Sequence, residues 1–427
     1  MTLVCGHDAP AYGPPLCAHL RAVAETDYFL RYTGVGWQSE HVCEGCRDES
    51  PPATEQVCEE CFDDLLGRAE GVVGAPQIAE APRPLDPTVD TTPLPGLAGE
   101  VVDMAPTERG LLLLGEDGRL LLWDVPGGDC TEVGRSSVAP AADANPRGRR
   151  SQTRRLHASS DGRFAAVVID YGRHGEVIDL TSGSVTRHLE NDGYHSDTVP
   201  FSLAFTTHGE RQAVLYRDQW NRIVACDPAT GETLASTPAS GEDAPWNRYF
   251  HGALLPSPRG THIVSDAWQW HPVGSVLVWN AGPESSLPTG PADWSQLAFC
   301  DYYWDRPLAW IGENRLAVGG IGEDDETLVN GATLYELTGA GDTQWVEAGA
   351  FPGPHGRFFA ADGLLFSAGE SGLEVWDPVE GARTGSVPGF RPTHHDPRTG
   401  ELLQLDADAG VLRGWHVGKA RAQAAGL

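Results

Sequence analysis

The chain contains 427 residues, 40% of them hydrophobic, and its 60 acidic against 30 basic side chains give a formal net charge of -30. Such a negative field repels phosphate backbones, so we expect nucleic acid not to be a general partner. The length suggests about two or three domains and is sufficient for a large core.

The sequence contains no apolar run long enough to cross a membrane, and its N-terminus lacks the basic and apolar regions of a signal peptide. We therefore expect a soluble, cytoplasmic protein without membrane partners. Lys419 is the single lysine among the basic residues, and this preference for arginine, with abundant Ala, Gly and Pro, is typical of a GC-rich bacterial genome.

The strongest chemical pattern lies near the beginning of the chain, where cysteine and histidine recur at short spacing. Two Cys-x-x-Cys pairs and two Cys-x-His pairs precede residue 62, and each pair can present two ligands to one tetrahedral ion. The predicted ligands are Cys5, His7, Cys17, His19, Cys43, Cys46, Cys58 and Cys61. Four ligands per ion predict two structural zinc ions.

Local patterns around these pairs predict a small α+β zinc-binding domain over residues 1–70. A short helix follows Cys17, a second helix follows Cys58 and Cys61, and a hairpin lies between them over 28–32 and 37–42. Since so short a domain has few large apolar side chains, metal coordination would supply most of its stability. Disulfides are the alternative, which the missing export signal disfavours.

Ligand-rich clusters of this kind resemble treble-clef and cross-brace zinc fingers. The resemblance leaves two pairings open: the Cys5 pair shares its ion with the Cys17 pair in tandem, or with the Cys43 pair in a cross-brace. His41 is a spare ligand candidate, although a solvated strand histidine is the simpler interpretation.

Residues 71–95 are rich in Pro and Ala and predict a stiff linker. Its end, over 85–92, is a candidate for the outermost strand of the last repeat, because that repeat stops after its third strand. Residues 419–427 are expected to form a tail.

Residues 96–418 consist of seven repeats, each with short apolar strands separated by Gly, Asp and Pro turns. The third strand of each repeat ends in a similar dipeptide, as at Trp123-Asp124, Trp279-Asn280 and Trp376-Asp377. This pattern resembles the WD-repeat family, although the Gly-His dipeptide of that family is missing. The resemblance implies a mainly β chain with a seven-bladed β-propeller.

In such a propeller, the loops between the second and third strands open on the same face as the loops that enter the first strands. These loops are rich in aromatic, acidic and histidine residues, a composition typical of binding hot spots. The predicted binding residues are Tyr249, His251, Asp266, Trp268, Trp270, Asp301, Tyr302, Trp304, Asp305, His394 and His395. A partner that is both apolar and cationic would suit aromatic rings beside carboxylates.

We therefore expect a non-catalytic scaffold whose propeller binds a protein or peptide and whose zinc module docks a second partner. The alternatives are a propeller hydrolase or lyase that uses His394, His395 and nearby acids, and a small-ligand or sugar sensor. No Gly-x-Ser-x-Gly, P-loop or dinucleotide motif marks a reaction type.

Overall fold

The computed structural model describes most of the chain as β-sheet. The described residues are 5–7, 12–22, 28–32, 39–46, 54–68, 78–96, 100–139, 150–209, 211–238, 247–270, 272–281, 287–288, 290, 293–322, 328–338 and 344–421. Among them, no helix is long and apolar enough to cross a membrane.

The N-terminal module is one mixed sheet flanked by short helices. Its strands pair in the order β2-β3-β1-β4, with β1 parallel to β3 and antiparallel to β4. The elements are β1 (Tyr12–Cys17), α1 (Ala18–Ala22), β2 (Phe29–Tyr32), β3 (Ser39–Val42), η1 (Glu44–Cys46), β4 (Thr54–Val57) and α2 (Glu59–Arg68). The predicted hairpin is therefore present as β2 and β3, while residues 37 and 38 lie outside the described part.

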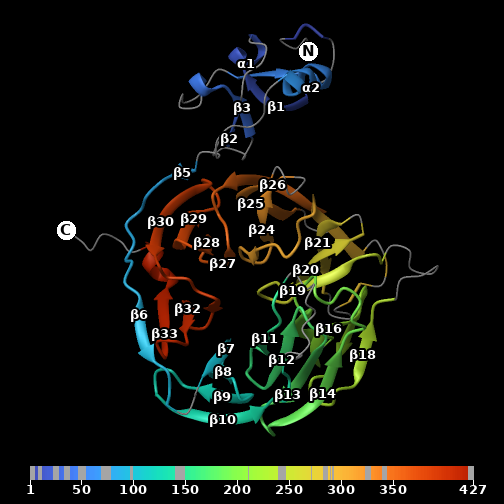
Figure 1. Ribbon diagram of the computed structural model, residues 1–427, viewed down its shortest axis with the longest axis vertical. Helices are drawn as coiled ribbons and strands as arrows, with labels where there is room; N and C mark the ends of the chain where they lie inside the picture. The colour runs from blue at the N-terminus through green and yellow to red at the C-terminus, as the bar shows by residue number, and fades with distance from the viewer. Residues whose placement is uncertain are drawn as a thin grey trace.

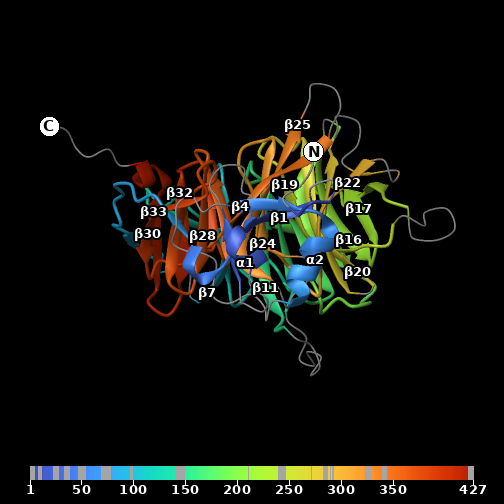
Figure 2. The same cartoon turned by 90° about the horizontal axis from the view of Figure 1, so that it is seen from above.

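The remaining sheets form a ring (Figure 1, and from the side in Figure 2). The region around the ring axis, where the first strands of the blades lie next to one another, is termed the channel. In chain order, blades one to three contain β7 (Val101–Thr107), β8 (Gly110–Gly115), β9 (Arg119–Trp123), β10 (Cys130–Arg135), β11 (Thr153–Ala158), β12 (Phe164–Asp170), β13 (His174–Asp179), β14 (Ser184–Glu190), β15 (Leu203–His208), β16 (Arg211–Gln219), β17 (Arg222–Cys226) and β18 (Thr233–Ser236).

Blades four to six contain β19 (Phe250–Pro256), β20 (His262–Gln269), β21 (Val273–Asn280), β22 (Trp294–Asp301), β23 (Leu308–Trp310), β24 (Arg315–Ile321), β25 (Val329–Thr338), β26 (Gln344–Pro352), β27 (Arg357–Ala361), β28 (Leu364–Gly369), β29 (Gly372–Asp377) and β30 (Ala382–Pro388). Blade seven contains β31 (His394–Asp396), β32 (Glu401–Asp406) and β33 (Val411–His416). The expected β-propeller is confirmed.

The segment expected to be a linker belongs largely to the propeller. Its strand β6 (Asp90–Pro93) pairs antiparallel with β33 and so supplies the fourth strand of blade seven. Strand β5 (Ala79–Glu80) adds a fifth strand to blade six by parallel pairing with β30. Figure 1 shows this segment running along the outside of both blades. The ring is thus closed by residues from the start of the propeller chain.

The predicted tail begins in ordered structure. The 3-10 helix η3 (Val417–Arg421) packs at the end of blade seven, and the Lys419 Nζ donates to the Thr88 carbonyl at 2.7 Å and lies 2.9 Å from Asp90 Oδ2. Trp415 also donates from its indole nitrogen to the Asp86 carbonyl at 2.8 Å. These contacts fasten the closing strand to the end of the chain. Residues 422–427 lie outside the described part.

The Trp-Asp dipeptides have separate packing and turn-forming roles. Trp376 is fully buried between blades five and six, where its indole nitrogen donates to Ser367 Oγ at 2.9 Å. Asp377 accepts the backbone N–H groups of Val379 and Glu380 at 2.9 and 3.2 Å, which stabilises the following turn. The repeat signature therefore builds the interblade core and the hairpin after it.

Candidate functional site

Two clusters of metal-ligating side chains lie in the N-terminal module. One consists of Cys5, His7, Cys58 and Cys61, and the other of Cys17, His19, Cys43 and Cys46. In each cluster all ligand atoms lie within 4.8 Å of one another. The pairing is nested. The Cys5/His7 pair, first in the chain, meets the last pair, Cys58/Cys61, and the two middle pairs meet each other. Both the tandem and the cross-brace pairings predicted from sequence differ from this arrangement.

The spacing within the first cluster fits a tetrahedral ion. Sulfurs bound at about 2.3 Å at tetrahedral angles lie roughly 3.8 Å apart. The Cys5 and Cys58 sulfurs are 3.8 Å apart, and His7 Nδ1 lies 3.2 Å from Cys58 Sγ and 3.5 Å from Cys61 Sγ. Three ligand contacts therefore have the separation that a shared ion would give, while a disulfide would require sulfurs about 2 Å apart.

The second cluster has the same form. His19 Nδ1 lies 3.1 Å from Cys46 Sγ and 3.8 Å from Cys43 Sγ, and the Cys43 backbone N–H donates to Cys17 Sγ at 3.3 Å. The parallel pairing of β1 and β3 places Cys17, at the end of β1, beside the turn that carries Cys43 and Cys46. Sheet topology, rather than sequence proximity, therefore selects the ligand partners.

Electrostatics in both clusters favour a bound cation. Burial, followed by neighbouring cysteines, raises the pKa of Cys46 to about 12 and that of Cys61 to about 11. Thiolates packed this closely repel one another, and a divalent ion reverses that effect because it binds the deprotonated form. The residues therefore fit a metal ion of the zinc type.

His41 is a core residue of the module. It is 7% exposed, stacks on Tyr28 with ring centroids 4.8 Å apart, and meets the edge of Phe62 at 5.3 Å. Burial lowers its pKa to about 4, so the neutral form is held between Tyr28 and Phe62. The solvated strand position expected from sequence is therefore wrong, because His41 is buried. His41 also belongs to neither cluster of metal-ligating side chains, so the spare-ligand role is not supported.

A second candidate site is an aromatic cluster on the upper face of the propeller, the side on which second strands end and first strands begin. Phe250 stacks on Trp268 with centroids 4.1 Å apart, Trp304 stacks on the other side of Trp268 at 5.6 Å, and Trp220 lies 4.6 Å from Phe250. The Trp304 indole nitrogen donates to the Thr198 carbonyl at 3.0 Å. This stack joins blades three, four and five.

The prediction that Trp268 belongs to an exposed surface is wrong. Trp268 is only 3% exposed because β20 continues to Gln269 and places this ring between Phe250 and Trp304. His251 and Asp266 are also fully buried: His251 stacks on Trp294 at 5.3 Å, and Asp266 accepts the Arg306 backbone N–H at 2.8 Å. These three residues support the upper face from within the blades.

Other predicted residues are accessible above this stack. Trp270 is 53% exposed and Tyr302 is 60% exposed, and Tyr194, which the prediction left out, is 47% exposed. Asp301 is exposed, whereas Tyr249, Trp304 and Asp305 are half-buried. His195 connects these groups, because its ring meets Trp268 at 5.7 Å and Trp270 at 5.0 Å edge to face.

Backbone strain concentrates on the same face. Among the described non-glycine residues, those with positive φ are Tyr171 (59°), His195 (51°), Tyr302 (56°), Asp305 (61°) and Asp362 (52°). All but Asp362 belong to upper-face loops. A left-handed conformation is costly for such side chains and is commonly retained where function requires a particular side-chain direction.

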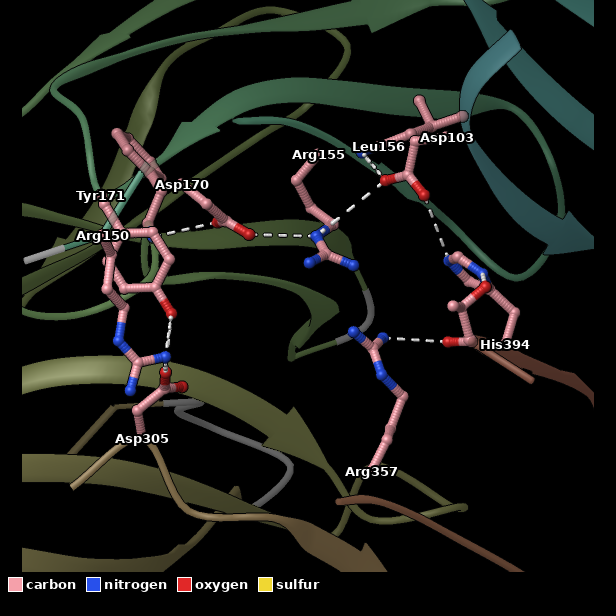
Figure 3. A network of polar contacts seen from close by, with 11 residues as sticks. Asp103, Arg150, Arg155, Leu156, Asp170, Tyr171, Asp305, Arg357 and His394 are labelled. Carbon is pink, nitrogen blue, oxygen red and sulfur yellow. Dashed lines mark hydrogen bonds and ion pairs between the residues drawn. The ribbon is translucent and has the colours of Figure 1, made fainter. Parts of the chain in front are cut away.

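A third candidate is a polar network among the first strands of several blades, next to the ring axis (Figure 3). Arg155 Nε donates to Asp170 Oδ2 at 3.0 Å and lies 3.9 Å from Asp103 Oδ2. The Asp103 carboxylate also accepts the Leu156 N–H at 2.8 Å, and its other oxygen lies 3.6 Å from His394 Nε2. Arg357 donates to the Thr393 carbonyl at 2.9 Å.

The two predicted histidines of blade seven, His394 and His395, are neighbours in β31. His394 faces the channel network, and burial together with Arg357 and Arg155 lowers its pKa to about 3, so it is neutral. His395 follows it in β31, where successive side chains point to opposite faces of the sheet. The two side chains therefore lie in different surroundings.

Sequence reasoning missed most of the channel network. Asp103, Arg155, Asp170 and Arg357 belong to no recognisable motif. The available signal was the recurrence of a charged residue near the start of a first strand, in β7, β11 and β27, because those strands line the channel.

No protein-family model matches the chain, and a search of curated proteins finds no significant match. Among solved structures, the chain is similar to a chain in the crystal structure of the Mitotic Checkpoint Complex, with 15% sequence identity and a TM-score of 0.48. The similarity covers 81% of this chain and 97% of that chain.

Proposed function

We propose that this protein is a non-catalytic interaction scaffold whose propeller binds a protein or peptide through the exposed aromatic side chains of blades two to five. The observation that supports this proposal is that solvent-accessible aromatic side chains lie against buried aromatic side chains. Tyr194, Trp270 and Tyr302 present about half or more of their surface to solvent, while the rings of Phe250 and Trp268 beneath them are buried.

A preorganised surface lowers the entropic cost of binding. Trp270 meets buried Trp268 edge to face at 5.5 Å, and Tyr194 lies 5.6 Å from Phe250. Exposed aromatic side chains held in this way are typical of binding hot spots. The surface suits a partner segment with apolar and cationic side chains, because Asp301 is exposed beside Tyr302 and the whole chain is strongly acidic.

We further propose that each Cys/His cluster binds one zinc ion in a structural role, and that the module docks a second partner. Its strand β2 contacts β26, the outermost strand of blade five, whereas the exposed rings lie in the upper-face loops. The two surfaces would therefore act separately. The Trp-Asp strand ends support a WD-repeat relationship, and the cytoplasm would supply the reducing conditions that thiolate ligands require.

Selection from a displayed library of random peptides tests the propeller surface. We expect selected peptides to combine Arg or Lys with apolar residues, and the Trp270→Ala, Tyr302→Ala double variant to bind them roughly tenfold or more weakly. Val379→Ala is the matched control, because Val379 is 67% exposed in a turn of the opposite face. If the double variant bound the selected peptides as tightly as the wild type, the exposed aromatic side chains would not be the peptide-binding surface.

A further inference from the structure

The mouth of the central channel holds two guanidinium groups with unequal partners. Arg155 is fixed through its Nε by Asp170, with Asp103 at a longer distance. Arg357 has no carboxylate within ion-pair distance among the described residues, and its one protein acceptor there is the Thr393 backbone carbonyl. Among the described residues, Arg357 therefore carries a positive charge that has no ion-pair partner. It lies beside Arg155, which is ion-paired with Asp170.

The free nitrogens of these arginines face a common space. In Figure 3, the terminal nitrogens of Arg155 point away from Asp170 and Asp103, toward the side on which the Arg357 guanidinium lies. Within the described part of the chain, no hydrogen bond engages those terminal nitrogens of Arg155. Guanidinium nitrogens arranged as a fork match the oxygens of a carboxylate or phosphate.

The surroundings make an anion favourable there. Burial, and then the charge of Arg155, lower the pKa of Arg357, although its side chain remains accessible to solvent. His394 and His157 line the same region in neutral form, since burial lowers their pKa values to about 3 and about 4. The positive charge that would attract an anion therefore comes from the arginines and not from the histidines.

Side chains from blades that are not neighbours meet beside this space. Tyr171 of blade two donates to Asp305 Oδ2 at 2.6 Å, although Asp305 lies in the loop between blades four and five. Arg150 donates to Tyr171 Oη at 2.9 Å and also contacts Asp305. Since Tyr171 and Asp305 both have positive φ, two strained loops hold this bridge across the channel mouth.

We propose that the channel mouth is a binding site for a small oxyanion, a carboxylate or phosphate group, held between the terminal nitrogens of Arg155 and the guanidinium of Arg357. Asp103 and Asp170 position Arg155 from its Nε side and leave its other edge free for the ligand. The Tyr171–Asp305 bridge forms one wall. This site shares no ligand-contacting residue with the aromatic surface, so its failure would leave the proposed scaffold function intact.

Titration calorimetry on the full-length protein tests the site, with inorganic phosphate and acetate as separate probes at constant ionic strength set by sodium chloride. We expect saturable binding of at least one probe, weakened about tenfold or more by Arg357→Gln, because one of two charge-assisted contacts is lost. Arg155→Lys keeps the charge and loses the fork, so it should weaken the same probe by a smaller factor. Preference for phosphate or acetate identifies which oxyanion the channel accepts.

Arg391→Gln is the matched control, because Arg391 is an exposed arginine of the neighbouring loop that also donates to a backbone carbonyl, that of Glu370. This variant should bind the probe like the wild type. Thermal unfolding of Arg357→Gln verifies that it remains folded. Absence of saturable binding by both probes, or equal affinity in Arg357→Gln and the wild type, would overturn the proposal.

Discussion

The N-terminal module and the propeller reach stability by different means. In the module, the buried apolar side chains form two small groups, around Cys17 and Val42 and around Leu16 and Phe62, and cysteine ligands are part of both. In the propeller, each pair of neighbouring blades shares a continuous apolar layer, as between Leu120 and Ile178 or between Phe366 and Trp415. The module therefore depends on coordination, and the propeller on packing and ring closure.

Metal removal should give the largest difference in stability between the module and the propeller. Chelation at neutral pH is expected to unfold residues 12–68 while the propeller retains its sheet signal, because zinc coordination contributes about 10 to 16 kcal/mol in small zinc domains. Hydrogen exchange followed by mass spectrometry can assign the loss of protection to each region. Unchanged protection of the module after verified metal loss would contradict its dependence on metal.

Zinc stoichiometry in double variants tests the nested pairing. Cys5→Ser with Cys61→Ser removes ligands from one cluster and should leave one zinc per chain. Cys5→Ser with Cys43→Ser damages both clusters and should leave none. A cross-brace would give the reverse result, so elemental analysis of the purified variants distinguishes the two arrangements.

Ring closure can be tested by truncation. A chain starting at Ile78 keeps β5 and β6, whereas one starting at Leu94 loses both strands and the Asp86 carbonyl that accepts from Trp415. The shorter chain exposes the β33 edge and should aggregate or lose cooperative thermal unfolding. Equal solubility and equal melting temperatures would show that β6 contributes little to closure.

Two tryptophans at the end of β20, Trp268 within the strand and Trp270 just after it, sharpen the comparison within the propeller. Trp268→Ala removes a buried ring from the stack and should lower the free energy of unfolding by about 3 to 5 kcal/mol. Trp270→Ala removes a ring that is 53% exposed and should leave stability nearly unchanged. Urea denaturation measures both, and similar losses for the two variants would contradict the assigned core and surface roles.

Much of the architecture could be predicted from sequence because its signals are local. Turn residues and strand patterns predicted the propeller, and Cys-x-x-Cys spacing predicted the ligand types. The partners of each ligand pair could not be predicted, because the parallel register of Leu16 with His41 determines which turns meet. Likewise, the sequence pattern predicts Trp268 in a loop, whereas β20 continues through it. The channel network unites Asp103, Arg155 and Arg357 from three blades, and no local pattern joins them.

A pH dependence provides the smallest expected effect. Burial raises the pKa of Asp266 to about 7, whereas an unfolded aspartate titrates near 3.9. Since the unfolded chain releases this proton first, the contribution of Asp266 to stability should fall as pH rises from about 4 to about 7, and change little above that. One pKa unit corresponds to about 1.4 kcal/mol, and relaxation around the buried carboxyl should limit the total to about 2 kcal/mol.

Asp266→Asn retains the shape of the side chain and cannot ionise, so the variant should gain stability relative to the wild type between pH about 5 and about 8. Urea denaturation at both values gives the difference, and titration of all other groups cancels in that comparison. Asp301→Asn is the control, because Asp301 is exposed and its replacement should leave the pH dependence unchanged. The opposite slope would mean that Asp266 is ionised in the folded protein and stabilised by Arg306, whose backbone N–H it already accepts.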